Sequence, residues 1–179
     1  MPKNDRNGQA EIWSEDQFQA VMAELSPKMR AAFSICYYSG CRISEALQLK
    51  AEDLISDRIV FRRMTTKTKQ TREVKIHPKL AAVLKQADLP KTGFLFPGRG
   101  KRGYLTRQAA DKALREACEY LGFVGFSTHS NRRTAATKLN NAGVPLRVIQ
   151  KVGGWSELSA LQKYLEVTPN QIDDAILKL

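Results

Sequence analysis

The sequence predicts a mainly α-helical α+β domain with a small antiparallel β-sheet. Most of the chain carries apolar residues at helical spacing, and capping residues, glycines and prolines bound these stretches. Two short segments rich in β-branched residues, 58–62 and 73–76, lie near the middle and favour strands. The length of 179 residues and the hydrophobic content of 42% suit one packed domain.

Two helices are predicted before residue 40. Ser14 and Gln17 match a capping box at the start of the first helix, and Trp13 is expected to pack in the core. The second helix opens at Pro27, which suits a first helical position, and ends at Gly40. Residues 1–12 precede these signals, and we expect them to be disordered.

A short helix follows in GCRISEALQL, with Arg42 at its head. A buried helix start favours an anion, and an arginine there would be held rigidly. Glu45 is one turn further on and can orient the Arg42 guanidinium. The simpler interpretation, that both are solvated surface charges, stays open from the sequence.

The strands 58–62 and 73–76 form a predicted hairpin whose tip is polar and basic. We expect Lys69 and Arg72 at this tip to contact DNA; a solvated loop is the alternative. The charge supports a polyanionic partner, because the net charge is +11 and segment 58–107 holds most of the excess.

The chain from 78 to 125 alternates helices with a basic loop. Pro78 begins a helix, and 106–121 is a second, with Ala109, Ala113, Ala117 and Leu121 expected on its packed face. Between them the loop FLFPGRGKRGYL mixes glycine, aromatic and basic residues, which suits a path along phosphates. The DNA contacts expected in this loop are Arg99, Lys101 and Arg102.

The stretch 126–167 carries the chemistry. His129 and Arg132 are three apart on a predicted helix and share a face. Trp155 follows a glycine pair, and Tyr164 lies near the end of a helix predicted to be capped by Ser156. The first three can donate hydrogen bonds to an anion, and a phenolic oxygen can attack phosphorus. Together they indicate phosphoryl transfer.

A last helix is predicted from Thr168, with an apolar stripe of Ile172, Ala175, Ile176 and Leu179. We expect this stripe to pack on its own domain or on a neighbouring molecule.

Other classes of protein are disfavoured. The three cysteines show no CxxC or Cys/His ligand spacing, so we expect reduced thiols and no metal site. No apolar run reaches about 18 residues and no signal peptide is present, which predicts a soluble cytoplasmic protein without a membrane partner.

From about Trp13 to Val167 the chain resembles the catalytic domain of the tyrosine recombinase and phage integrase family. Five motifs carry the resemblance in the family's order: GCRISEALQL, TKT, THSNRRTAAT, GGWS and QKYLEV. The resemblance implies the tyrosine-recombinase fold for 13–179. Family members typically add an N-terminal helical domain, so the chain reads as a minimal recombinase or as the catalytic domain of a longer protein.

The resemblance also implies roles. Arg42 and Arg132 would clamp the scissile phosphate while His129 and Trp155 donate to its oxygens. Lys67 would protonate the departing 5′ oxygen, and Tyr164 would attack phosphorus to form a 3′-phosphotyrosine. No metal or cofactor is implied. The partners implied are double-stranded DNA, further copies of the chain in a tetramer, and accessory DNA-bending proteins at the nucleoid.

Three departures from the family pattern leave alternatives. Arg133 stands where a histidine is common, and we expect it to contact DNA. Trp155 replaces a commoner histidine and can donate but not accept. Lys69 competes with Lys67 as the acid, with Lys67 favoured. A topoisomerase-like nicking and closing enzyme, or a non-catalytic DNA-binding module, are the alternative functions.

Overall fold

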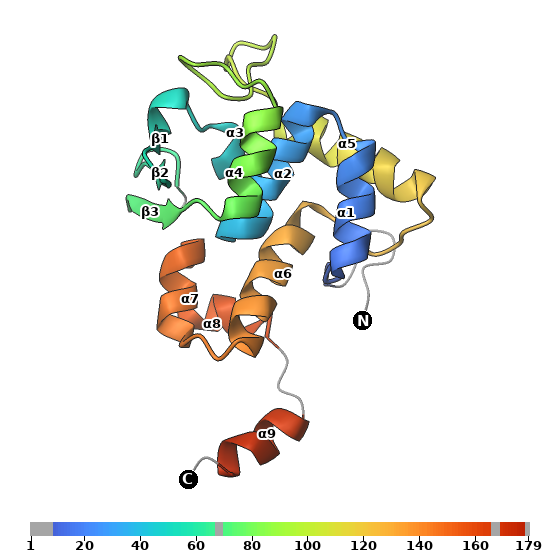
Figure 1. The fold of residues 1–179 in the computed structure, drawn as a ribbon, viewed down its shortest axis with the longest axis vertical. Helices are drawn as coiled ribbons and strands as arrows, with labels where there is room; N and C mark the ends of the chain where they lie inside the picture. Colours follow the sequence, from blue (N-terminus) through green and yellow to red (C-terminus); the bar gives the residue numbers. More distant parts are fainter. Residues whose placement is uncertain (1–8, 67–69, 166–168, 178–179) are drawn as a thin grey trace.

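The computed structural model describes residues 9–66, 70–165 and 169–177. It is mainly helical, with a small sheet at one edge of the helical body (Figure 1). In chain order the elements are α1 (Glu15–Glu24), α2 (Pro27–Ser39), α3 (Ile43–Leu47), the 3-10 turn η1 (Ala51–Asp53), β1 (Leu54–Ile55), β2 (Arg58–Phe61), β3 (Arg72–Lys75), α4 (Pro78–Gln86), α5 (Arg107–Tyr120), α6 (Thr128–Asn141), α7 (Leu146–Gly153), α8 (Leu158–Gln162) and α9 (Pro169–Ile176). The predicted fold class is confirmed.

The sheet is antiparallel in the order β1-β2-β3. Its β2–β3 pair confirms the predicted hairpin, and its register sets Phe61 opposite Arg72. The two-residue strand β1 adds an edge that the sequence analysis missed, because two residues are too short to show an alternating pattern. The hairpin thus brings Arg72 back beside the body of the molecule.

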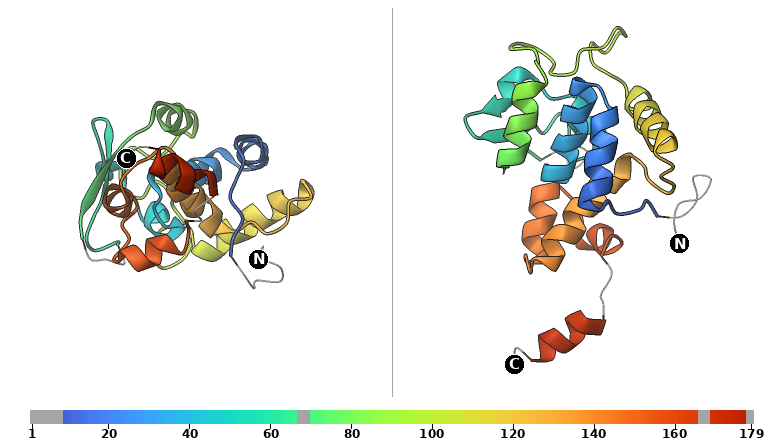
Figure 2. Two further views of the ribbon diagram at one scale, coloured as in Figure 1. Left: turned by 90° about the horizontal axis from the view of Figure 1, so that it is seen from below. Right: turned by 45° about the vertical axis from the view of Figure 1, so that its right-hand side comes forward.

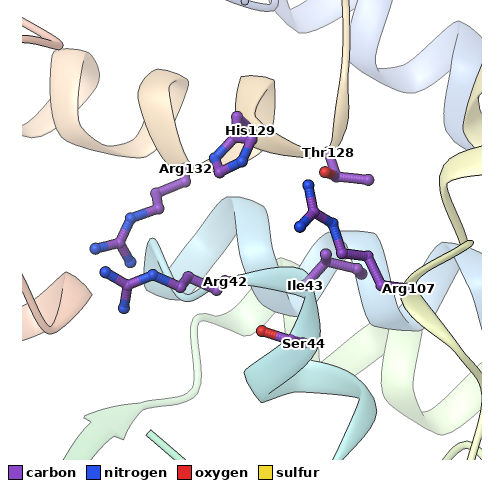
Figure 3. A pocket seen from close by; sticks show the side chains of 7 residues that line it. All are labelled: Arg42, Ile43, Ser44, Arg107, Thr128, His129 and Arg132. Carbon is purple, nitrogen blue, oxygen red and sulfur yellow. The ribbon is translucent and has the colours of Figure 1, made fainter. Parts of the chain in front are cut away.

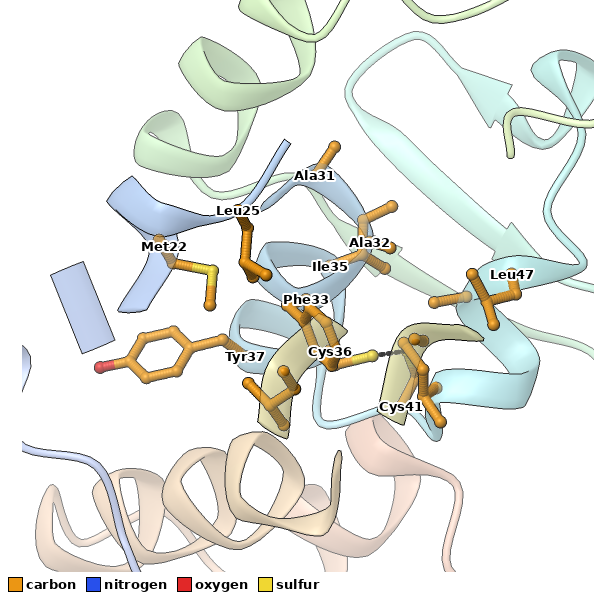
Figure 4. Packing of buried hydrophobic residues seen from close by; sticks show 14 of the residues in the cluster. Met22, Leu25, Ala31, Ala32, Phe33, Ile35, Cys36, Tyr37, Cys41 and Leu47 are labelled. Atoms are coloured by element: carbon orange, nitrogen blue, oxygen red, sulfur yellow. Dashed lines mark hydrogen bonds between the residues drawn. The ribbon is translucent and has the colours of Figure 1, made fainter. Parts of the chain in front are cut away.

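Helix α2 forms the centre of the larger core. Ala31, Ala32, Phe33, Ile35 and Cys36 are all completely buried, so the middle of the helix is enclosed on every side (Figure 4). A helix that is apolar all round belongs in an interior. Figure 2 shows the sheet and α5 on opposite sides of it.

A smaller core lies among α6, α7 and α8. Ala136, Ile149, Trp155 and Leu161 are its buried residues, and Tyr164 packs against it. Helix α6 contributes to both cores, because its Thr134 hydroxyl also accepts a hydrogen bond from the backbone N–H of Trp13 at 2.9 Å. This helix therefore fixes the smaller core relative to the larger one.

Of residues 1–12, for which disorder is expected, residues 1–8 lie outside the described residues and residues 9–12 make tertiary contacts. Ala10 is buried, and the Glu11 N–H donates to the Gly125 carbonyl at 3.0 Å. Trp13 stacks on Phe126 with ring centroids 3.7 Å apart, which confirms Trp13 as a core residue. These tertiary contacts order a segment whose own composition is polar.

Two helix details also differ from expectation. The buried face of α5 is formed by Ala110, Leu114, Ala117 and Cys118. The predicted face stepped by four residues throughout, and such a row drifts around a helix of about 3.6 residues per turn. Helix α8 begins after Glu157 rather than with a Ser156 cap. Thr168, the expected cap of α9, lies outside the described residues.

The cysteines Cys36, Cys41 and Cys118 are free and buried. Within the described ranges, no helix combines the length and the apolar character that crossing a membrane requires.

Candidate active site

Arg42, His129 and Arg132 line one pocket of about 50 Å³ (Figure 3). Arg42 is the N-cap residue of α3, whereas His129 and Arg132 lie one turn apart in the first half of α6. The tight turn at Gly40, with φ of 64°, ends α2 and delivers Arg42 to this place. The pocket therefore brings together residues 90 positions apart in the chain.

Arg132 is held almost completely inside the protein. Its side chain is 2% exposed, and Nη1 donates to the carbonyl oxygens of Gly40 and Gly153, the latter at 2.6 Å. Its guanidinium carbon lies 3.7 Å from the centre of the Trp155 ring. Nη2 is buried and has no hydrogen-bond partner among the described atoms, so one donor remains for a ligand.

Burying the positive charge of Arg132 costs free energy, but the side chain stays protonated at neutral pH. Burial, followed by the nearby Arg42 charge, lowers the pKa of Arg132 to about 10. At neutral pH the group is still a cation. An anion entering the pocket would relieve the repulsion between the two guanidinium groups.

Arg42 is oriented by Glu45, as the sequence suggested. Its Nη1 lies 3.1 Å from Glu45 Oε1, and its backbone N–H donates to Oε2 at 3.3 Å. Burial raises the pKa of the Glu45 carboxyl, but the charges of Arg72 and Arg42 outweigh this and hold the pKa below its ordinary value. Glu45 is therefore ionised at neutral pH, and Arg42 keeps a fixed direction.

Trp155 packs against Arg132, and the turn that precedes Trp155 leaves room for its ring. A Cβ atom at Gly153 would lie 1.8 Å from the Trp155 ring, so the fold of this turn requires glycine there. The indole N–H is buried and has no acceptor among the described atoms. The ring contacts both the Arg132 guanidinium and, edge-on, the Tyr164 ring, so the role visible here is packing with these two side chains.

Tyr164 lies just after α8, in a turn beside a second pocket of about 390 Å³. Its ring meets Trp155 edge-on, with centroids 6.1 Å apart. His129 lines both pockets and therefore stands between the arginine pair and the phenol. The second pocket also contains Arg133 and Lys163. Cations therefore line both pockets, and the phenol lines the second.

Two residues expected to contact DNA lie largely inside the protein. Arg72 is 11% exposed and forms an ion pair with Glu45 at 2.7 Å. Arg133 is 7% exposed, and its Nη1 donates to the Ala10 carbonyl at 2.7 Å. Each guanidinium group thus has an acceptor inside the protein, which periodicity and charge counts could not reveal.

The remaining predicted residues fall into two groups. Arg99, Lys101 and Arg102 are exposed on the loop between α4 and α5, as a phosphate-contacting loop would require. Lys67 and Lys69 lie outside the described residues.

The sequence analysis missed Arg107. It is the first residue of α5, and it lines the first pocket opposite Arg42 and Arg132 (Figure 3). Its position directly after the Thr106 cap, at the end of the basic segment, was the available signal, because a helix start attracts anions. Among the described residues no group of three or more His, Cys, Asp or Glu side chains is placed to hold a metal ion.

Known proteins are similar to this chain in sequence and in fold. The model of the Phage integrase family matches residues 12–171. A candidate integrase/recombinase of Sinorhizobium fredii, y4qK, is 34% identical over 90% of this chain and 54% of its own length. Tyrosine recombinase XerD of Rickettsia bellii is 28% identical over 99% of this chain and 66% of its own length. The chain thus spans about half to two thirds of these relatives.

A solved structure of the Tn1549 transposon integrase, in complex with a circular intermediate DNA, has the same fold. It superposes with a TM-score of 0.77 at 17% sequence identity, covering 98% of this chain and 68% of that one. The pocket of Arg42, His129 and Arg132 beside Tyr164, and the family match over nearly the whole chain, lead to one conclusion: the chain belongs to the phage integrase family of tyrosine recombinases.

Proposed function

We propose that this chain is the catalytic domain of a site-specific DNA recombinase that cleaves and rejoins strands through a 3′-phosphotyrosine. The observation that carries the proposal is the convergence of Arg42, His129 and Arg132 on one pocket, with Tyr164 on the far side of His129. Tyrosine alone is a weak nucleophile, because its ordinary pKa is about 10. Clustered cations favour both the bound phosphate and the phenolate.

In the proposed first step the Tyr164 oxygen attacks phosphorus and the bond from phosphorus to the 5′ oxygen breaks. The phenolic proton passes to His129, which lines both pockets. Arg42 and the Nη2 of Arg132, which has no partner within the described part of the chain, stabilise the charge that grows on the phosphoryl oxygens. These fixed cations supply the stabilisation that a metal ion gives elsewhere, so we propose a metal-independent transesterification. Attack by another DNA hydroxyl reverses it.

We propose Lys67 as the acid that protonates the leaving 5′ oxygen, with Lys69 as the other candidate. A DNA in which sulfur replaces that 5′ oxygen needs no acid, because a thiolate leaves unaided. Lys67→Ala should therefore cleave this DNA at nearly the wild-type rate while failing on normal DNA. Rescue of Lys69→Ala, with Lys67→Ala unaffected on normal DNA, would move the role to Lys69.

The proposed partner is double-stranded DNA at the bacterial nucleoid, bound by several copies of the chain, with a tetramer and accessory DNA-bending proteins in the synapse. The similar fold of an integrase bound to DNA supports this. So do the exposed cations Arg99, Lys101 and Arg102. Such contacts with phosphates weaken steeply as salt rises.

The direct test is trapping of the covalent intermediate. Sequencing the DNA bound by the Tyr164→Phe variant identifies the target site. A duplex of that sequence is then made with a nick close to the cleavage position. Cleavage releases the short fragment next to the nick, and its loss prevents religation. The wild-type chain should form an adduct visible on a denaturing gel, and Tyr164→Phe should form none. Tyr120→Phe is the matched control, because Tyr120 is 77% exposed on α5.

The alternatives predict other outcomes. An adduct that is resealed without ever joining a second duplex would favour a topoisomerase-like enzyme. Specific DNA binding without an adduct from wild-type protein would reject catalysis and favour a binding module.

A further inference from the structure

Arg72 has an environment that neither its predicted DNA contact nor the proposed chemistry explains. Its Nη2 forms an ion pair with Glu45 Oε2 at 2.7 Å, and its Nε donates to the Val152 carbonyl at 3.1 Å. The guanidinium carbon lies 4.2 Å from the centre of the Phe61 ring. With 11% of its side chain exposed, Arg72 is held by an anion, a carbonyl and an aromatic face at once.

The partners of Arg72 are connected to different parts of the catalytic clamp, the pair Arg42 and Arg132 proposed to hold the phosphate. Glu45 lies on α3 and uses its other oxygen to orient Arg42. Val152 belongs to the last turn of α7, whose next residue, Gly153, accepts from Arg132 and makes room for Trp155. One side chain on β3 therefore links the end of α3 that presents Arg42 with the end of α7 that supports Arg132.

The packing around this link is close. A Cβ atom at Gly154 would lie 2.8 Å from the Arg72 guanidinium carbon, and Gly154 has a φ of 70°. Arg42 Nη1 also lies 3.5 Å from the Gly154 carbonyl oxygen. Gly154, in the turn after α7, is therefore in close contact with both Arg72 and Arg42.

We propose that Arg72 is a positioning residue of the catalytic clamp, which fixes Arg42 through Glu45 and fixes the Arg132 and Trp155 platform through the end of α7. This inference rests on the proposed function, because it assigns Arg72 a part in phosphate binding at that same site.

The electrostatics agree with the geometry. The side chain of Glu45 is 1% exposed, and a buried carboxylate is stable only when paired. The charged and titratable groups around it are Arg42 on α3, Arg72 on β3, Arg132 on α6, Cys36 on α2 and Cys41. The Arg72 charge is the largest influence that lowers the Glu45 pKa, whereas burial raises it.

Burial raises the Glu45 pKa, and the Arg72 charge is the largest influence that opposes it. We therefore expect the Glu45 pKa to rise when Arg72 is removed. Glu45 is then ionised at high pH and becomes protonated as the pH falls through the raised pKa. Protonated Glu45 no longer holds Arg42, so the variant should lose cleavage on the acid side while the wild type does not.

The experiment measures single-turnover cleavage of the nicked substrate from about pH 8 to about pH 5.5. Arg72→Met should slow cleavage about 100-fold near neutral pH, as displacement of catalytic groups by about 1 Å does, and should add an acid limb. Arg72→Lys keeps the charge beside Glu45 and should abolish the acid limb while cleavage stays slow. Arg58→Met is the control, because Arg58 is exposed on the neighbouring strand β2.

A double variant separates positioning from folding. Arg72→Met combined with Glu45→Gln removes the unpaired buried carboxylate, so it should fold, remain slow and show no acid limb. Adduct formation by the wild type with unchanged rates and pH profiles in all Arg72 variants would overturn the inference. Absence of an adduct from the wild type would instead reject the proposed function, so the two failures are distinguishable.

Discussion

At the residue scale, the site is defined by cations placed close together with little to neutralise them. Arg42, Arg107 and Arg132 share one pocket with His129. Glu45 pairs with Arg42, yet one buried donor of Arg132 has no partner among the described atoms. Such an arrangement costs free energy in the empty protein and is repaid when an anion binds. The pocket is therefore preorganised for an anion, as the proposed binding of a phosphate requires.

Arg107 is expected to help bind the reacting phosphate. Figure 3 shows its guanidinium reaching from α5 toward Thr128 and His129, on the opposite side of the pocket from Arg42 and Arg132. Losing one charge-assisted hydrogen bond of about 1.5 kcal/mol corresponds to a roughly tenfold fall in rate. Arg107→Ala should show this fall in single-turnover cleavage at saturating DNA.

The matched control is Arg115→Ala, which removes an exposed arginine of the same helix that is paired with Asp111 at 2.9 Å. Both variants lower the net charge equally. Equal loss of cleavage in the two would show that Arg107 acts only through general attraction to DNA.

At the element scale, α1, α2 and α6 are joined by a polar cluster of Glu15, Tyr37 and Lys138. Lys138 Nζ lies 2.8 Å from Glu15 Oε2, and the Tyr37 hydroxyl donates to the same oxygen at 3.0 Å. Because α6 carries His129 and Arg132, this cluster supports the site from a distance. The hydrogen bond from Lys138 leads the influences that lower the pKa of Glu15 to about 2.

Stability should depend on this cluster in a defined pH range. The folded-state pKa of Glu15 is depressed from 4.5 to about 2, so its contribution is complete above pH 4.5 and is lost as the pH falls toward 2. Because 43% of the Glu15 side chain is exposed and solvent screens its ion pairs, we expect the Glu15→Gln variant to lose under about 1 kcal/mol at neutral pH. The difference from wild type should vanish near pH 2.

Urea unfolding of both proteins across this range measures the difference. Glu24→Gln, at the other end of α1, is the control and should show no such pH dependence. A Glu15→Gln difference that persists unchanged at the lowest pH would mean that the carboxylate charge is not what the cluster uses.

At the scale of the whole molecule, α9 stands away from the helical body (Figure 1). Ile172 and Ile176 are 56% and 63% exposed, and Leu177 is 84% exposed. The amphipathic pattern of this helix predicts a partner surface, and the described part of this molecule leaves these side chains uncovered. Docking on a neighbouring copy, one of the two options left by the sequence, is therefore the expectation.

Replacing Ile172 and Ile176 together with serine tests this. If α9 docks in trans, the thermal midpoint of the isolated chain should stay within about 2 °C, because surface substitutions cost little. Assembly of several copies on DNA should weaken, as measured by sedimentation of the complex. A marked loss of thermal stability in the isolated chain would instead indicate docking on its own domain.

Most of the secondary structure could be predicted, because it depends on signals local in the chain. The Ser14–Gln17 capping box and the Gly40 helix end are examples. The convergence of Arg42, His129 and Arg132 was anticipated through the family resemblance, since spacing alone could relate only His129 to Arg132. The burial of Arg72 and Arg133 was missed, because a charge count does not show which cations meet internal acceptors.

The sequence by itself therefore determined the helices, the hairpin, the basic character and the residue types that suit phosphoryl transfer, since each depends on neighbours a few positions apart. Only the tertiary structure decided which cations form the clamp, that Arg107 joins it, and that Arg72 is turned inward to Glu45. The physical reason is that burial and charge pairing depend on contacts between distant segments, such as Gly40 with Arg132.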